Sequence, residues 1–144
     1  WQVTGVDRVP EAVALAQGNG TRLQLANARF AESCWFSALA GQRFQLIVSN
    51  PPYIAAADPH LSQGDVRFEP SSALVAGVDG LDDIRLIIEQ APEHLLAGGW
   101  LLLEHGFDQA EAVRELLGQR GFAAVDSRRD LGGHQRISLG QWPL

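Results

Sequence analysis

Short apolar runs alternate with segments of helical periodicity along the whole chain of 144 residues. The run at 44–49 is almost continuously apolar, which predicts a strand buried on both faces. Pro92 lies inside the longest helical pattern and predicts a kink or break there. Strands are predicted at 2–6, 21–26, 44–49, 100–104, 122–127 and 135–141, and helices at 10–17, 81–96 and 108–120. The alternation indicates one α/β domain over residues 1–144 with a mostly parallel sheet.

The predicted helices have recognisable ends. Gly18 is expected to close the first helix and Gly121 the third, because glycine readily adopts the conformation that ends a helix. Asp108 and Glu111 have the spacing of a capping box at the start of the third helix. A turn around residues 132–133, both glycine, is expected to join the last two strands.

A long irregular segment, residues 50–80, follows the buried strand. A loop of this length in a compact domain usually has a functional role. It begins with Asn50-Pro51-Pro52-Tyr53 (the tetrapeptide), at the carboxyl end of the strand, where parallel sheets bind ligands. Farther along, Arg67 and Glu69 either pair with each other and order the loop or contact a substrate. Both alternatives stay open.

The tetrapeptide has the groups needed to hold a planar amide or amine nitrogen for methyl transfer. The lone pair of an amide nitrogen is delocalised into the carbonyl, so an enzyme must hold both N–H groups to direct it. The side-chain oxygen of Asn50 and the carbonyl of Pro51 can each accept one N–H. The prolines hold the backbone at little further entropic cost, and Tyr53 can lie flat against the planar group. The simpler alternative is a Pro-rich turn in which Tyr53 only packs.

Two residues after the first two predicted strands could hold a nucleoside. Asp7 can bind the two ribose hydroxyls or cap the helix that begins at Pro10. We favour ribose binding because the tetrapeptide indicates a methyl donor. Trp35 could stack on adenine or cover the sheet edge. Cys34, beside it, is expected to be an inert packing residue.

Composition narrows the possible functions. The net charge of −6 argues against broad binding to a nucleic acid backbone, and no apolar run is long enough to span a bilayer. The four His residues lack metal-ligand spacing, so no metal site is expected. The single Cys is typical of a reducing compartment such as the cytoplasm. Because the sequence contains no Met and opens on a strand-like segment, we expect it to be part of a longer protein.

Several motifs match one enzyme family. They are the stretch 47–54 with the tetrapeptide, Gly64-Asp-Val-Arg-Phe-Glu-Pro70, and the stretches 6–13, 35–39, 58–61, 73–76 and 98–106. On these residues the chain resembles the release factor glutamine methyltransferases over nearly its whole length. The tetrapeptide is shared with other amino-methyltransferases, whereas the segment at 64–70 is more particular to this family.

The resemblance implies a Rossmann-like, class I S-adenosylmethionine-dependent methyltransferase domain whose final strand is antiparallel. The family transfers a methyl group from S-adenosyl-L-methionine, releasing S-adenosylhomocysteine. The acceptor is the side-chain amide nitrogen of the Gln in the Gly-Gly-Gln (GGQ) motif of bacterial peptide chain release factors. The expected partners are therefore the GGQ-containing domains of release factors in the cytoplasm, with no membrane and no direct contact to nucleic acid.

The resemblance also assigns roles to the candidate residues. Asp7 would hold the donor's ribose, and Trp35 would lie against its adenine. Asn50 would contact both the donor and the substrate amide. The remaining tetrapeptide residues would complete the glutamine pocket: Pro51, Pro52 and Tyr53. Of these, Asn50, Pro51 and Tyr53 are the expected catalytic residues.

Two departures from the family change what is expected. Cys34 stands where family members usually carry an acidic residue that can bind the adenine amino group. The family also has an N-terminal helical domain and a first strand with a Gly-rich loop under the donor's methionine, and the sequence begins at the second strand. We expect a domain truncated at its N-terminus, without the central strand beside the strand that precedes Asn50. The isolated chain is expected to bind the donor weakly and to be unstable.

Two other functions stay open at this point. A DNA adenine-N6 methyltransferase needs the same tetrapeptide, but would have to flip its target base out of the duplex. The acidic charge and the lack of a basic recognition region argue against it. The second alternative is an inactive truncated fragment that keeps the substrate pocket without the donor site.

Overall fold

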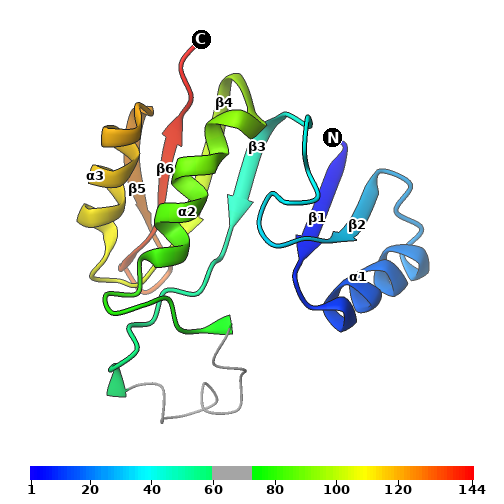
Figure 1. The fold of residues 1–144 in the computed structure, drawn as a ribbon, viewed down its shortest axis with the longest axis horizontal. Helices are drawn as coiled ribbons and strands as arrows, with labels where there is room; N and C mark the ends of the chain where they lie inside the picture. The colour runs from blue at the N-terminus through cyan, green and yellow to red at the C-terminus, as the bar shows by residue number, and fades with distance from the viewer. Residues whose placement is uncertain (60–72) are drawn as a thin grey trace. The chain divides into compact units, whose positions relative to one another are not determined.

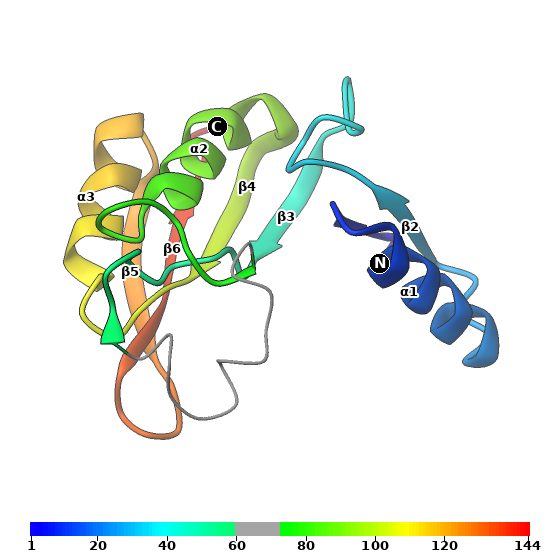
Figure 2. The same cartoon turned by 60° about the horizontal axis from the view of Figure 1, so that its bottom comes forward.

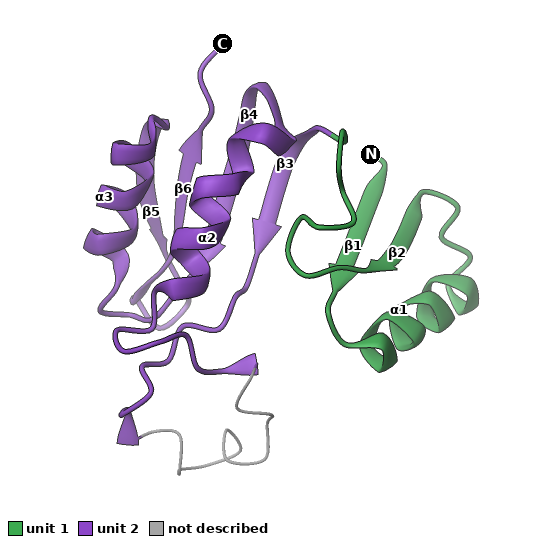
Figure 3. Cartoon of the chain, in the orientation of Figure 1, with its two compact units in different colours: residues 1–42 green, residues 43–144 purple. Residues whose placement is uncertain are grey.

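The computed structural model describes residues 1–59 and 73–144. These residues form two compact units, 1–42 and 43–144 (Figure 3). The first unit consists of β1 (Val3–Asp7), α1 (Pro10–Arg22) and β2 (Ala28–Glu32). The second consists of β3 (Phe44–Ser49), α2 (Asp82–Gln90), the 3-10 helix η4 (Ala91–His94), β4 (Leu95–Glu104), α3 (Ala110–Arg120), β5 (Ala123–Arg129) and β6 (Gln135–Gln141).

Each unit has its own sheet. The first sheet pairs β1 with β2 in parallel, and the second has the strand order β3-β4-β6-β5. In the second sheet β3 and β4 are parallel, and β6 is antiparallel to both of its neighbours. The predicted α/β class with an antiparallel final strand is therefore confirmed. β1 and β3, which the resemblance predicts on either side of an absent central strand, belong to separate sheets.

In the first unit the ring of Phe30 lies between α1 and β1. A Cβ on Gly20 of α1 would be 3.0 Å from Phe30 Cε2, and one on Gly5 of β1 would be 2.8 Å from Phe30 Cδ1. Glycine at both positions leaves space for the ring. The predicted helix end at Gly18 and the predicted strand at 21–26 are both wrong, because α1 continues to Arg22 and the strand lies at 28–32.

In the second unit α2 and α3 lie side by side on one face of the four-stranded sheet (Figure 1, Figure 2). Their apolar side chains and those of β4 form the core beneath them. The fully buried members are Ile84, Leu101, Leu103, Val113 and Leu117, each 0 % exposed. The break predicted at Pro92 is confirmed, since α2 ends at Gln90 and η4 follows.

The prediction that β3 is buried on both faces is wrong. Leu46 is 40 % exposed and Val48 is 68 % exposed. β3 lies at one end of the strand order of its sheet and pairs with β4. An apolar run alone cannot show whether a strand is covered on one face or on both.

The start of α3 also differs from the prediction, whereas its end agrees. The N-cap residue is Gln109, so Asp108 does not cap the helix. Gly121 ends the helix in the left-handed conformation, with φ 103°, as predicted. The side chain of Gln109 turns back toward the end of β4, and its Oε1 accepts the Gly106 N–H at 2.7 Å. This hydrogen bond joins α3 to the loop that follows the strand.

Candidate active site

The tetrapeptide lies at the carboxyl edge of the sheet in the second unit. β3 and β4 are parallel, and Ser49 is in register with Leu103, so both strands end at the same edge. Asn50 is exposed there, and its side chain makes no hydrogen bond with any residue that the structure describes. Pro51 is fully buried beside it. A rigid, buried proline therefore follows an amide side chain that is free to bind a ligand.

The side chain of Tyr53 is held by groups from two strands. Its hydroxyl donates a hydrogen bond to Glu104 Oε1 at 3.3 Å, at the end of β4. The guanidinium carbon of Arg136, from β6, lies 5.7 Å from the centroid of the ring. At this distance a cation is attracted to an aromatic face. Both contacts order the ring, which is half-buried.

Glu104 and Arg136 contact Tyr53 in the candidate site, and neither was predicted from the sequence. Glu104 is the last residue of β4, a position where a polar side chain is expected to face a ligand in a parallel sheet. Glu104 could therefore have been predicted from its position in the sequence. No sequence pattern could have predicted Arg136, because its approach to Tyr53 depends on the pairing of β6 with β4.

The backbone that follows the tetrapeptide is paired with a later part of the same loop. Ile54 and Val75 form an isolated parallel bridge. The Ile54 N–H donates to the Leu74 carbonyl at 2.8 Å, and the Ala76 N–H donates to the Ile54 carbonyl at 3.1 Å. The segments 50–59 and 73–80 therefore support each other. The predicted roles of Arg67 and Glu69 lie outside the described residues.

In the first unit Asp7 lies exposed at the carboxyl end of β1. Its Oδ1 accepts the Val9 N–H at 2.8 Å, in the turn before α1. Val9 is the N-cap residue and has no side-chain cap, so Asp7 orders the turn rather than capping the helix. Asp7 is in register with Glu32, and its carbonyl accepts the Ser33 N–H at 2.9 Å. The loop after β2 therefore starts at the edge where Asp7 lies.

That loop holds Trp35 in an uncommon backbone conformation. Trp35 is half-buried, and its φ of 49° is in the left-handed region, which bulky residues seldom adopt. The Ser33 hydroxyl donates to the Trp35 carbonyl at 2.8 Å and accepts the Ala38 N–H at 3.0 Å. Strain held in this way is frequent at ligand sites. Cys34 is exposed, so the predicted packing role of its thiol is wrong.

The candidate residues fall into two groups. The tetrapeptide, Glu104 and Arg136 lie at one sheet edge in the second unit. Asp7 and the loop of Trp35 share the carboxyl edge of the sheet in the first unit. Each group is thus at the end of parallel strands where ligands bind in α/β folds.

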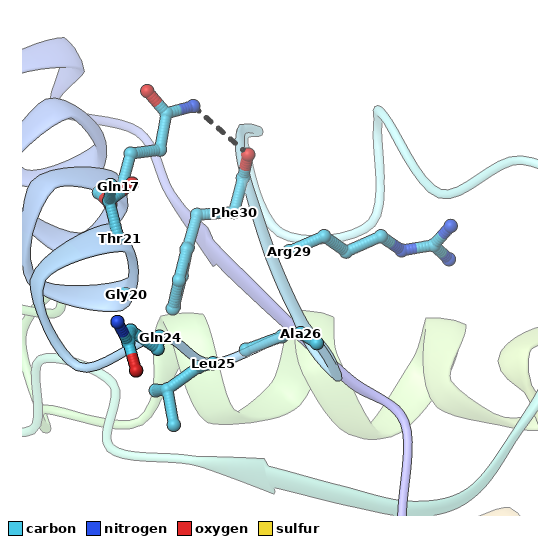
Figure 4. Close-up of a pocket in the computed structure, with 9 residues that line it drawn as sticks. Gln17, Gly20, Thr21, Gln24, Leu25, Ala26, Arg29 and Phe30 are labelled. Carbon is cyan, nitrogen blue, oxygen red and sulfur yellow. Dashed lines mark hydrogen bonds between the residues drawn. The ribbon is translucent and has the colours of Figure 1, made fainter.

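A pocket of about 460 Å³ lies elsewhere in the first unit (Figure 4). It opens between the second half of α1 and the beginning of β2, and Gln17 Nε2 donates to the Phe30 carbonyl at 3.3 Å beside it. Neither Asp7 nor Trp35 lines it. The pocket lies near the start of β2, whereas Asp7 is in register with the end of that strand.

His105, next to Glu104, is part of a buried polar network. It is 0 % exposed; Nδ1 is 2.8 Å from the Gly106 carbonyl oxygen, and Nε2 is 2.8 Å from Ser138 Oγ. The carbonyl can only accept, so Nδ1 carries the hydrogen and Nε2 accepts from Ser138. Burial lowers the pKa of His105 below 6.5. Folding therefore disfavours the protonated form of this imidazole.

The lowered pKa makes stability depend on pH. Between the ordinary pKa of about 6.5 and the lower folded value, the unfolded chain binds a proton that the folded chain does not. The contribution of His105 is complete above that range and decreases as the pH falls through it, by at most about 1.4 kcal/mol per pH unit. Urea unfolding of the full-length gene product between pH 5 and 8 measures the slope. We expect His105→Gln to reduce this slope; a slope equal to that of the unsubstituted protein would contradict the assignment.

Residues 1–59 and 73–144 lack two further kinds of feature. Among these residues, no group of three or more His, Cys, Asp or Glu side chains could hold a metal ion. Within the same ranges, none of the helices has the length and apolar character needed to cross a membrane.

Comparison with solved structures identifies the fold. A methyltransferase from Pyrococcus furiosus superposes with a TM-score of 0.75, 18 % identity, and coverage of 99 % of this chain and 64 % of that one. An N-methyltransferase NodS from Bradyrhizobium japonicum, solved with S-adenosyl-L-homocysteine, superposes with a TM-score of 0.60 and 14 % identity, and the match covers 99 % of this chain and 67 % of that one. A release factor-specific protein-(glutamine-N5) methyltransferase from Alicyclobacillus acidocaldarius superposes with a TM-score of 0.54 and 23 % identity, and the match covers 99 % of this chain and 80 % of that one. The fold is that of the class I methyltransferases.

Comparison with curated sequences is more specific. No protein-family model matches the sequence. The release factor glutamine methyltransferase of Pseudomonas aeruginosa is 70 % identical over 99 % of the chain, and that of Vibrio cholerae is 58 % identical over 98 %. The chain spans about half of each relative's length, 51 % and 50 %. The resemblance stated from the sequence is therefore confirmed: over nearly its whole length the chain is similar to about half of a release factor glutamine methyltransferase.

Proposed function

We propose that the full-length protein containing this chain transfers a methyl group from S-adenosyl-L-methionine to the GGQ glutamine of a peptide chain release factor. The acceptor atom is the side-chain amide nitrogen of that glutamine. The observation that carries the proposal is the exposed Asn50 side chain at the carboxyl edge of β3, followed by the buried Pro51. The relatives are named as release factor glutamine methyltransferases, which supports a release factor glutamine as the acceptor.

The tetrapeptide suits an amide acceptor. The side-chain oxygen of Asn50 and the carbonyl of Pro51 would each accept one N–H of the substrate amide, which turns the nitrogen lone pair toward the methyl donor. Tyr53, held by Glu104 and Arg136, would cover the plane of the amide and exclude water. The proposed catalysis is positioning in a preorganised polar site, and no general base in this chain is required for it.

The residues of the first unit suit the donor. Asp7 offers an exposed carboxylate, one oxygen of which is engaged by the Val9 N–H, so the carboxylate is held in place for the ribose hydroxyls. Trp35 would lie against the adenine. When bound, S-adenosyl-L-methionine supplies an electrophilic methyl group on a positively charged sulfur and leaves as S-adenosylhomocysteine. The proton lost from the amide nitrogen would pass to water from the N–H held by Asn50.

Because release factors act on the ribosome, we place the reaction in the cytoplasm. A methyl-transfer assay with the full-length gene product and isotope-labelled donor tests the proposal. We expect label in the release factor, none in a release factor whose GGQ glutamine is replaced by alanine, and none in duplex DNA. Label in DNA alone would favour the adenine-N6 alternative. Absence of label from both substrates in a folded protein would favour the inactive-fragment alternative.

A further inference from the structure

The side chain of Gln109 makes three hydrogen bonds to backbone groups from three different loops. Its Nε2 donates to the Tyr53 carbonyl at 2.9 Å and to the Asp79 carbonyl at 3.1 Å. Its Oε1 accepts the Gly106 N–H at 2.7 Å. Only one of the two possible amide orientations satisfies these partners, since two of them accept and one donates. Both donors and the acceptor of this amide are therefore in use.

Each loop that Gln109 joins is attached to a regular element. Gly106 follows β4, and Gln109 itself is the N-cap residue of α3. Asp79 is held at the start of α2, because its Oδ1 accepts the Leu81 N–H at 3.1 Å and its Oδ2 lies 2.5 Å from Arg85 Nη2. The Tyr53 carbonyl is thereby bound to a side chain at the start of α3, and the two other contacts of that side chain reach the end of β4 and the start of α2.

The space around these contacts is filled. Gly80 has φ 75°, and a Cβ there would collide with the Tyr53 carbonyl and lie 2.8 Å from Gln109 Nε2. The Tyr53 carbonyl thus occupies the space that a side chain at position 80 would need, and displacing the carbonyl would break its hydrogen bond to Gln109. Tyr53 is the last residue of the tetrapeptide, so its position influences the preceding residues through the two prolines.

We propose that Gln109 is a positioning residue for methyl transfer, which holds the Tyr53 carbonyl and through it the acceptor groups of Asn50 and Pro51. Its role in catalysis rests on the proposed function. Small displacements of positioned groups lower rates strongly, since about 1 Å can cost on the order of 100-fold. Gln109 does not contact the reacting atoms, so we expect a smaller loss, about tenfold in kcat, with the KM for the donor unchanged.

Two substitutions separate positioning from folding. Gln109→Met removes all three hydrogen bonds at similar volume. Gln109→Glu keeps the acceptor for the Gly106 N–H, but places carboxylate oxygens against two carbonyls until it is protonated. A protonated carboxyl again donates one hydrogen bond to a carbonyl. We therefore expect the kcat of Gln109→Glu, relative to that of the unsubstituted enzyme, to rise as the pH falls. Gln119→Met and Gln119→Glu, at an exposed position of the same helix, are matched controls.

The experiment measures kcat and KM of the full-length gene product and its four variants between pH 5 and 8, with release factor as substrate. The proposal predicts a lower kcat for both Gln109 variants and an acid-shifted profile for Gln109→Glu alone. Activity of both Gln109 variants equal to that of the controls would overturn it. The proposal would also be overturned if kcat fell equally in Gln109→Met and Gln109→Glu and its pH dependence did not change, since that result indicates damage to the fold only.

A second measurement keeps the positioning claim separate from the proposed function. If the unsubstituted protein transfers no methyl group, the proposed function fails, and amide hydrogen exchange of the peptide over residues 50–56 decides the positioning claim. We expect exchange there to be faster in Gln109→Met than in Gln119→Met. Equal exchange in the two variants would show that Gln109 does not hold this segment.

Discussion

Replacing Asn50 with alanine is expected to lower the rate of methyl transfer by about 10²–10³-fold, the loss typical of removing one group that stabilises a transition state. Asn50 is exposed, and its side chain has no hydrogen-bond partner among the described residues, so its removal should leave the fold intact. The full-length gene product carrying Asn50→Ala is compared with the unsubstituted protein by label transfer and by thermal melting. The melting temperature should remain nearly constant while kcat falls.

Gln45→Ala is a matched control for Asn50→Ala. Gln45 is also an exposed amide residue, and it lies on β3, the strand that leads to Asn50. Its removal should change neither the rate nor the melting temperature. Near-normal turnover in Asn50→Ala would contradict the proposal that the side-chain oxygen of Asn50 holds the substrate amide. A similar loss in both variants would indicate that the strand, rather than the amide group, was disturbed.

Of the substitutions proposed here, Gly80→Ala is expected to lower the stability of the fold most. A residue other than glycine in the left-handed region costs about 1–2 kcal/mol, and Gly80 has φ 75°. The added Cβ would also collide with the Tyr53 carbonyl, which is backbone and cannot rotate away. Overpacking of this kind typically adds about 1–3 kcal/mol. We therefore expect Gly80→Ala to lower the free energy of unfolding by about 2–5 kcal/mol, measured by urea denaturation of the full-length gene product.

Gly133→Ala separates the cost of the left-handed backbone conformation from the cost of the collision with Tyr53. Gly133, in the turn between β5 and β6, also has a left-handed φ of 84°, but nothing lies within 4 Å of a Cβ placed there. Its replacement should cost only the conformational part, about 1–2 kcal/mol. Equal losses in the two variants would contradict the collision with Tyr53. Gly80→Ala should in addition lower methyl transfer, because the carbonyl that it displaces is the one bound by Gln109.

Much of the architecture follows from local patterns. The apolar run at 44–49 and the helix at 110–120 were predicted nearly to their ends, because strand composition and a terminal glycine are local signals. The predicted first helix ended too early. Gly18 ends a helix only when the chain turns there, and α1 instead continues to Arg22 with Phe30 packed over Gly20. The tendency of a glycine to end a helix is overridden when the next turn of the helix packs against a side chain from another element, as Gly20 does against Phe30.

Three features follow from the amino-acid sequence alone: the α/β class, the similarity to release factor glutamine methyltransferases, and the place of the tetrapeptide at the end of a strand. Those features depend on residue type and on short spacings along the chain. The tertiary structure alone decided which groups hold the tetrapeptide. Glu104, Gln109 and Arg136 reach Tyr53 because parallel pairing of β3 with β4 and antiparallel pairing of β6 with β4 bring distant segments to one edge. Such contacts have no local pattern, since they arise only when the strands pair.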